Sequence, residues 1–241
     1  VQAPFVTYHV LDRDGKLDIY IVNGWRLDGS RIVEKGRNAL FRGKGGGGFE
    51  DVTAKAKVSG EGHWASGAFA ADHDGDGWTD LLVTNFGPNL LYRNRGDGTF
   101  EEVAARYGAV LTEPRVSRGL AVGDLDDDGR LDVVINDLDG SPQVLRNELA
   151  GAGHWLSVRL VGKGKNTNAI GAVVTVKSGG VTQSRLVQSG TSYVSQDDMR
   201  RHFGLGASGV ADRVEVRWAD GSLTTLAGVA ADRGIEVQQP R

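Results

Sequence analysis

The feature that most constrains the fold of this chain is an aspartate-rich loop that occurs three times, each time directly before an apolar run. The stretch DHDGDGWTDLLVTNFG (72–87) returns as DLDDDGRLDVVINDLDG (124–140). A further copy, VLDRDGKLDIYIVNG (10–24), carries Val10 where the other two have their first aspartate. Internal repeats of about 50 residues are typical of propellers and related repeat architectures.

A second block of sequence follows each loop. The segment NALFRGKGGGGFEDV (38–52) aligns without gaps on NLLYRNRGDGTFEEV (89–103), and QVLRN (143–147) begins another copy. Each block reads as an apolar strand, a glycine-rich turn and a second strand, which is typical of a β-hairpin. The first copy has an insertion around 25–36. We therefore expect an all-β chain of propeller-blade-like repeats.

The loop pattern D-x-D-x-D-G-x-x-D has the chemistry of a site for a hard cation. Carboxylates at alternate positions can point inward from one tight turn, and the glycine allows the bend. A calcium ion takes about six to eight oxygen ligands and would balance the crowded charges. The predicted ligands are Asp72, Asp74, Asp76, Asp80 and the Trp78 carbonyl in one site; Asp124, Asp126, Asp128, Asp132 and the Arg130 carbonyl in another; and Asp12, Asp14, Asp18 and the Lys16 carbonyl in a third.

Two alternatives bear on this prediction. The aspartates could cap local N–H groups as Asx-turns, but two full copies and one partial copy at matched positions favour a metal. Magnesium is the weaker candidate because it rarely takes a cage made only of protein carboxylates. The loop that begins at Val10 lacks its first ligand, so we expect its site to be weaker or empty.

These motifs resemble the FG-GAP/VCBS repeats of integrin α-chain propellers and many secreted bacterial proteins, most clearly in SRGLAVGDLDDDGRLDVVIN (117–136). The C-terminal third resembles the ASPIC/UnbV domain of cartilage-acidic-protein-like proteins. The resemblance implies an all-β extracellular protein with calcium-stabilised blades and no settled catalytic activity. The segments that carry the second resemblance are HWLSVRLVG (154–162), NAIGAVVTVKSGG (168–180), QSGTSYVSQDD (188–198), RHFGLG (201–206) and VEVRWADGS (214–222).

The C-terminal third also reads as a compact, sandwich-like β-domain from its pattern alone. Several runs alternate between apolar and polar residues, whereas SQDDMRRHFGLG (195–206) reads as a polar turn. Small residues cluster in 148–154, so we expect two domains, 1–150 and 151–241. About two and a half blades cannot close a propeller. We therefore expect an incomplete propeller: either blades are missing upstream, or another chain supplies them, or the sheets stack openly. An open stack leaves strand edges that favour pairing with a neighbour or with a second copy.

The composition excludes several classes of function. The net charge of −3 gives no basic field for nucleic acid, and the absence of cysteine excludes thiolate chemistry. No apolar stretch is long enough to span a membrane. The chain begins with Val1 and carries no signal peptide, so we expect a processed product or a fragment. No H-E-x-x-H or G-x-S-x-G motif supports an enzyme.

Two tempting features have plainer interpretations, and a third keeps a functional one. The RGD at 95–97 aligns with a hairpin turn of the first repeat. His202 is expected to be a hydrogen-bonded residue, with Arg200, Arg201 and Asp197 near it in a polar pocket. Trp78 lies within a metal loop, where an exposed ring could stack on a sugar.

We therefore expect a secreted calcium-binding β-protein with a structural or adhesive role and a protein partner or self-association. One alternative is a carbohydrate-binding module. Another is an enzyme with an unrecognised site in the C-terminal domain.

Overall fold

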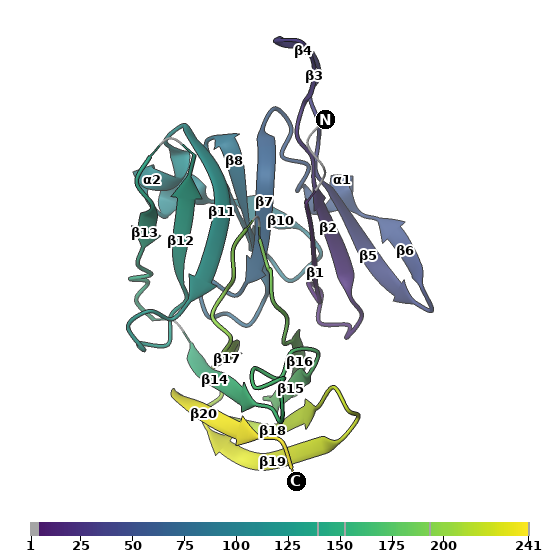
Figure 1. The fold of residues 1–241 in the computed structure, drawn as a ribbon, viewed down its shortest axis with the longest axis vertical. Helices are drawn as coiled ribbons and strands as arrows, with labels where there is room; N and C mark the ends of the chain where they lie inside the picture. Colours follow the sequence, from purple (N-terminus) through teal and green to yellow (C-terminus); the bar gives the residue numbers. More distant parts are fainter. Residues whose placement is uncertain (1–4, 139, 152, 193, 241) are drawn as a thin grey trace.

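The computed structural model describes residues 5–138, 140–151, 153–192 and 194–240, and strands dominate it (Figure 1). The first sheet follows the order β1 (Phe5–His9), β2 (Asp18–Val22), β5 (Ala39–Gly45) and β6 (Gly48–Asp51). The insertion in the first repeat forms a small separate hairpin, which the sequence did not predict, from β3 (Arg26–Asp28) and β4 (Arg31–Glu34).

The second and third sheets repeat this arrangement. The second sheet contains β7 (Trp64–Ala71), β8 (Asp80–Gly87), β9 (Leu90–Asn94) and β10 (Phe100–Glu102), and the third contains β11 (Arg115–Gly123), β12 (Asp132–Asp137) and β13 (Gln143–Leu145). A short β8–β11 pairing joins the two sheets at one end. Helical turns are short: α1 (Thr53–Ala56), η1 (Ala104–Arg106) and α2 (Ala109–Thr112).

The three sheets stack side by side like neighbouring blades, and they do not close on themselves (Figure 1). Tyr20 and Leu40 of the first sheet pack with Leu81 and Tyr92 of the second. A separate cluster, which includes Leu82 and Ile135, joins the second sheet to the third. The expectation of an all-β chain with an incomplete propeller is confirmed. The first repeat also has a strand before its loop, which its sequence did not indicate, because β1 pairs with β2 and completes a four-stranded first sheet.

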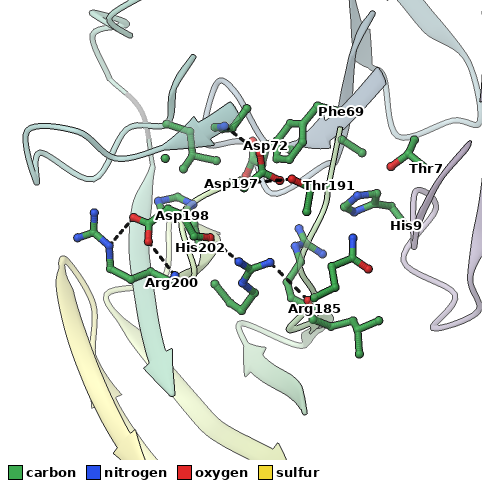
Figure 2. Close-up of a pocket in the computed structure, with 18 of the residues that line it drawn as sticks. Thr7, His9, Phe69, Asp72, Arg185, Thr191, Asp197, Asp198, Arg200 and His202 are labelled. Carbon is green, nitrogen blue, oxygen red and sulfur yellow. Dashed lines mark hydrogen bonds and ion pairs between the residues drawn. The ribbon is translucent and has the colours of Figure 1, made fainter. Parts of the chain in front are cut away.

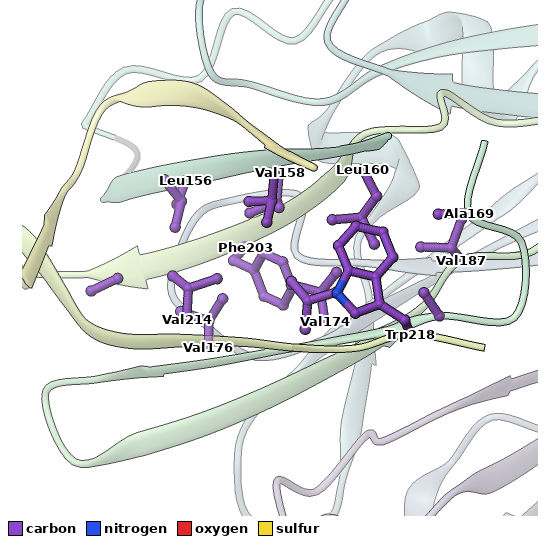
Figure 3. Packing of buried hydrophobic residues seen from close by; sticks show 14 of the residues in the cluster. Leu156, Val158, Leu160, Ala169, Val174, Val176, Val187, Phe203, Val214 and Trp218 are labelled. Atoms are coloured by element: carbon purple, nitrogen blue, oxygen red, sulfur yellow. The ribbon is translucent and has the colours of Figure 1, made fainter. Parts of the chain in front are cut away.

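The C-terminal sheets form a sandwich, called here the C-terminal sandwich (residues 154–238). One sheet has the order β17 (Arg201–Gly206), β14 (His154–Val161) and β20 (Arg233–Gln238), and the other has the order β16 (Val181–Leu186), β15 (Val173–Ser178), β18 (Val210–Arg217) and β19 (Leu223–Ala230). Leu156, Phe203 and Trp218 lie between the sheets and are almost fully buried (Figure 3).

The prediction of a polar turn over 195–206 is wrong for its second half, because Arg201–Gly206 is strand β17. Two glycines and the polar residues Arg201 and His202 hide the strand pattern in the sequence. The neighbouring strand β14 supplies the pairing partner, with Leu156 opposite Phe203. A long-range partner has therefore overridden a weak local preference.

Candidate metal centres

In each repeat, the aspartate that closes the loop also begins a strand, and it holds the loop through backbone hydrogen bonds. Its carboxylate accepts one N–H from the start of the loop and another from the neighbouring strand or the residues just after it. In the first repeat, Asp18 accepts the N–H groups of Leu11 at 2.8 Å and Gly43 at 3.0 Å. In the second repeat, Asp80 accepts those of His73 at 3.0 Å and Asn94 at 2.7 Å. In the third repeat, Asp132 accepts those of Leu125 at 2.9 Å and Asn147 at 2.8 Å. This arrangement explains why the spacing recurs in all three copies.

In the loop of the second repeat, three of the predicted ligands lie close together. Asp72, Asp74 and Asp76 each place a carboxylate oxygen within 4.8 Å of the others. The Oδ2 atom of Asp72 accepts the N–H of Gly77 at 2.8 Å, and Gly77 makes the bend at φ +83°. The Oδ1 atom of Asp72 is buried and has no hydrogen-bond partner among the described residues. An unsatisfied buried carboxylate oxygen is costly, and a cation would satisfy it.

The loop of the third repeat forms an equivalent group. Asp124, Asp126 and Asp132 place their carboxylate oxygens within 4.8 Å of one another. Asp124 accepts the N–H groups of Asp128 and Gly129 at 3.0 and 2.9 Å. Asp124 and Asp132 are buried, whereas Asp126 is exposed. Oxygen donors alone, at this density, suit a hard cation such as calcium.

The loop of the first repeat differs in the way that its sequence predicts. Among the residues that the structure describes, Asp12, Asp14 and Asp18 form no comparable group of three ligands. The carboxylate of Asp14 pairs instead with the ammonium of Lys16 at 2.9 Å. Val10 supplies no oxygen from its side chain at the first position.

Burial and mutual repulsion raise the pKa values of these carboxyl groups. Burial, followed by the charges of Asp80, Asp76 and Asp74, raises the pKa of Asp72 to about 7. Burial also raises the pKa of Asp18 to about 6, although two backbone hydrogen bonds oppose the shift. A divalent cation would hold both groups in the charged form and remove the repulsion.

Arginines already balance part of the charge in the two loops. Arg93, at the end of β9, contacts the carboxylates of Asp74 and Asp76 at 2.6 and 3.0 Å. Arg146 occupies the equivalent place in the third repeat and contacts Asp126 at 2.5 Å. The sequence interpretation missed these residues, although the aligned arginines in YRN and LRN were a visible signal. They compete with a metal for the same oxygens.

The loops also contact one another. The Nε of Arg13, in the first loop, donates to the carbonyl of Gly77 at 3.0 Å, and its guanidinium lies 3.7 Å from the centre of the Trp78 ring. A Cβ added to Gly96 would lie 2.7 Å from the same ring, so Gly96 packs closely against it. Trp78 is therefore not the exposed ring that the carbohydrate hypothesis required.

His73 is a further residue that the sequence interpretation missed. Its Nδ1 lies 2.5 Å from Oδ2 of Asp80. Burial lowers the pKa of His73, but the hydrogen bond and charge of Asp80 outweigh burial and raise it overall. The contact with Asp80 therefore favours the protonated form of the His73 ring over the neutral form.

The C-terminal sandwich docks on the two loops. The Nε2–H of His202 donates to the carbonyl of Gly129 at 2.8 Å, as expected for a hydrogen-bonded histidine. Arg200 donates to the carbonyl of Asp124 at 2.7 Å and pairs with Asp127 at 2.5 Å. A Cβ on Gly204 would lie 2.0 Å from Oδ2 of Asp72. The aspartate loops of the second and third repeats therefore form part of the interface with the sandwich.

A cavity of about 120 Å³ remains between the loops and the sandwich (Figure 2). Asp72 and His9 line it from the repeats, whereas Arg185, Asp197 and His202 line it from the sandwich. Burial lowers the pKa of Arg185 to about 10, and the charge of Asp72 opposes this shift. The N–H of Val122 donates to Asp197 at 2.9 Å. A pocket is therefore present near His202, as expected, with Asp197, Arg200 and Arg201 among its lining residues, and its charged groups connect the two parts of the chain.

The RGD at 95–97 lies in the hairpin turn between β9 and β10, as its alignment predicts. The N–H of Arg95 donates to the carbonyl of Thr99 at 3.0 Å, which closes the turn. Asp97 accepts hydrogen bonds from both the N–H and the hydroxyl of Thr99. These contacts give Asp97 a structural role within the hairpin turn.

Comparisons with known proteins agree with this architecture. The FG-GAP-like repeat family matches residues 11–83 and 72–135, and the family described as ASPIC and UnbV matches residues 162–241. Cartilage acidic protein 1 of Mus musculus is 28% identical over 95% of this chain and 36% of its own length. The Homo sapiens protein of that name is 26% identical over 86% of this chain and 41% of its own length.

The chain thus spans about two fifths or less of the curated relatives that it matches. Among the residues that the structure describes, no helix is long and apolar enough to cross a membrane. The matches to the repeats and to the segment that follows them cover most of the sequence. The chain belongs to the FG-GAP-like repeat family and carries an ASPIC and UnbV domain after its repeats.

Proposed function

We propose that this chain is an extracellular calcium-binding structural or adhesive module. In this proposal, residues 1–150 form the repeat domain, whose loops bind Ca²⁺, and residues 151–241 form a second domain docked on those loops. The second and third loops bind calcium through the predicted aspartates and through the carbonyls of Trp78 and Arg130. The first loop, with Asp12, Asp14, Asp18 and the Lys16 carbonyl, binds weakly or stays empty.

The observation that carries the proposal is the buried Oδ1 of Asp72. It lies in a group of three clustered carboxylates and has no hydrogen-bond partner in the described part of the chain. Hydrogen bonds within the loop account for Oδ2 of the same residue but not for Oδ1. The Asx-turn alternative therefore explains only part of the loop. A calcium ion would satisfy the remaining oxygen and would neutralise the repulsion that raises the pKa of Asp72.

The ion would also stiffen the surface on which the sandwich rests. Gly129 and Asp124 belong to the third loop, and their carbonyls accept hydrogen bonds from His202 and Arg200. A metal-ordered loop would present these carbonyls in a fixed position. The chemistry that we assign to calcium is thus structural, which is consistent with the non-enzymatic role that we propose.

Calorimetric titration of the metal-free chain with Ca²⁺ tests the proposal. We expect two sites. The Asp72→Asn and Asp124→Asn variants should each lose one, because each removes a charged ligand from a different loop. Asp12→Asn is the matched control in the first loop and should leave both sites unchanged. Absence of calcium binding by the unmodified chain would contradict the proposal.

A further inference from the structure

The first sheet has two apolar faces, and only one of them packs against the second sheet. Tyr20 and Leu40 point toward the second sheet and are 1% and 4% exposed. On the opposite face, Ile19 pairs across the strands with Phe41, and both are only partly buried. Phe49 continues this face on β6 and is 45% exposed. We call Ile19, Ile21, Phe41 and Phe49 the outer face of the first sheet.

The internal repeat indicates what kind of surface fits this outer face. Its residues align, position by position, with residues of the second sheet. The aligned pairs are Ile19 with Leu81, Ile21 with Val83, Phe41 with Tyr92 and Phe49 with Phe100. In the second sheet all four positions are buried, at 0%, 0%, 4% and 5% exposure, in the cluster that contains Tyr20 and Leu40. The complementary surface is thus the opposite face of a neighbouring blade.

The same rule holds at the next interface. Tyr20 and Leu40 align with Leu82 and Leu91, which are each 7% exposed and pack in the cluster shared with the third sheet. That cluster also includes Ile135, which aligns with Ile21. Two successive interfaces therefore use the same positions, and each joins one face of a blade to the other face of the next.

The third sheet presents the matching face at the other end of the stack. Val134 and Val144, the aligned equivalents of Leu82 and Leu91, lie side by side across β12 and β13. Val144 is 64% exposed. Figure 1 shows β12 and β13 on one side of the stack and β2, β5 and β6 on the other. The chain therefore carries both halves of one blade interface, at its two opposite ends.

We propose that two copies of this chain associate head to tail, with Val134 and Val144 of one copy on the outer face of the first sheet of the other. This inference deepens the proposed function, on which it rests, by naming the interaction surface and its partner. Such an interface joins two different patches, so it is heterologous and forms a ring only if the rotation closes. Two copies would supply six sheets, within the range of about four to eight blades found in propellers.

Sedimentation or light scattering with Ca²⁺ present tests this inference. The unmodified chain should show twice the mass of one copy. Phe41→Asp and Val144→Asp should each give the mass of one copy, because each places a charge on one half of the interface. Leu223→Asp, at a position that is 58% exposed on β19 of the sandwich, is the matched control and should leave the mass doubled.

Mixing the two disrupted variants gives a sharper test. Phe41→Asp retains the face of the third sheet, and Val144→Asp retains the outer face of the first sheet. An equimolar mixture should therefore recover association through one intact heterologous interface, and misfolded variants could not do so. An unmodified chain that stays monomeric, or a mixture that stays monomeric, would overturn the inference.

Calorimetry on the same samples separates this inference from the proposed function. A monomer that binds Ca²⁺ at two sites would leave the calcium proposal standing and remove only the head-to-tail interface. A chain that associates but binds no Ca²⁺ would remove the calcium proposal and leave only the head-to-tail interface standing.

Discussion

At the scale of single residues, each full aspartate loop has a choice between two positive partners. Arg93 and Arg146 reach the carboxylates from their own repeats, whereas calcium would take the same oxygens from within the loop. Exposed ion pairs contribute little to stability, typically below about 1 kcal/mol. The arginines therefore neutralise part of the charge of each loop, and in the proposed function a divalent ion would replace them at these oxygens.

Arg93→Gln should raise the affinity of the second loop for Ca²⁺ several-fold, because it removes a competing positive charge beside Asp74 and Asp76. Calorimetric titration measures the change. Arg26→Gln is the control, since Arg26 pairs with Glu34 on the separate hairpin at 3.3 Å. An affinity that falls with Arg93→Gln would show that the arginine supports the metal site instead of competing with it.

The protonation of His202 is a second property of a single residue. Burial, followed by the charges of Arg185 and Arg200, lowers the pKa of His202 to about 4, although its hydrogen bond to Gly129 opposes the shift. Between pH 6.5 and about 4, the unfolded chain therefore binds a proton at this position that the folded chain does not. Proton binding therefore favours the unfolded chain, and His202 lowers the free energy of unfolding as the pH falls from 6.5 to about 4.

His202→Gln should therefore lose less stability than the unmodified chain on acidification, by about 1–2 kcal/mol at pH 5 relative to pH 7. Urea unfolding at both pH values measures the difference. Asp72 and Asp18 titrate in the opposite direction, but they do so in both proteins, and the comparison removes their effect. Parallel pH dependences would contradict the assignment.

At the scale of elements, strands with an apolar run and a turn signal could be predicted from the sequence. The segments after the three loops are β2, β8 and β12, and the predicted hairpins are β5–β6 and β9–β10. Strands β17 and β20 could not be predicted, because their pairing with β14 is distant in sequence and, for β20, parallel. The aspartate spacing indicated which residues would cluster. It could not indicate that His202 and Arg200 would dock on the third loop, since docking depends on the packed sandwich.

Strand β17 connects the sandwich to the second loop through a close approach at Gly204. A Cβ at this position would lie 2.0 Å from Oδ2 of Asp72, so Gly204→Ala should lower the free energy of unfolding by about 1–3 kcal/mol. Urea unfolding tests this expectation. Gly234→Ala on β20 is the control, because in the described ranges no atom outside its immediate neighbours lies within 4 Å of an added Cβ there. Equal effects of the two substitutions would show that the contact with the loop is not specific.

At the scale of the whole molecule, three stacked sheets and a sandwich meet at the aspartate loops (Figure 1). The core of the sandwich is separate from the two clusters between the stacked sheets, and the loops with the cavity lie between these parts. The loops are thus placed where a bound ion would influence both parts of the chain. Both ends of the described stack carry apolar residues, and the proposed head-to-tail association rests on them.

The most direct test of the calcium assignment is the melting temperature of the chain in EGTA, in Ca²⁺ and in Mg²⁺. A ligand that binds only the folded chain stabilises it by about 2.7 kcal/mol at a hundredfold excess over its Kd. For a chain of this size, that is a rise of about 5–10 °C per site. We predict that EGTA lowers the melting temperature, that Ca²⁺ restores it and that Mg²⁺ restores it poorly. A melting temperature that is the same in EGTA and in Ca²⁺ would contradict the account.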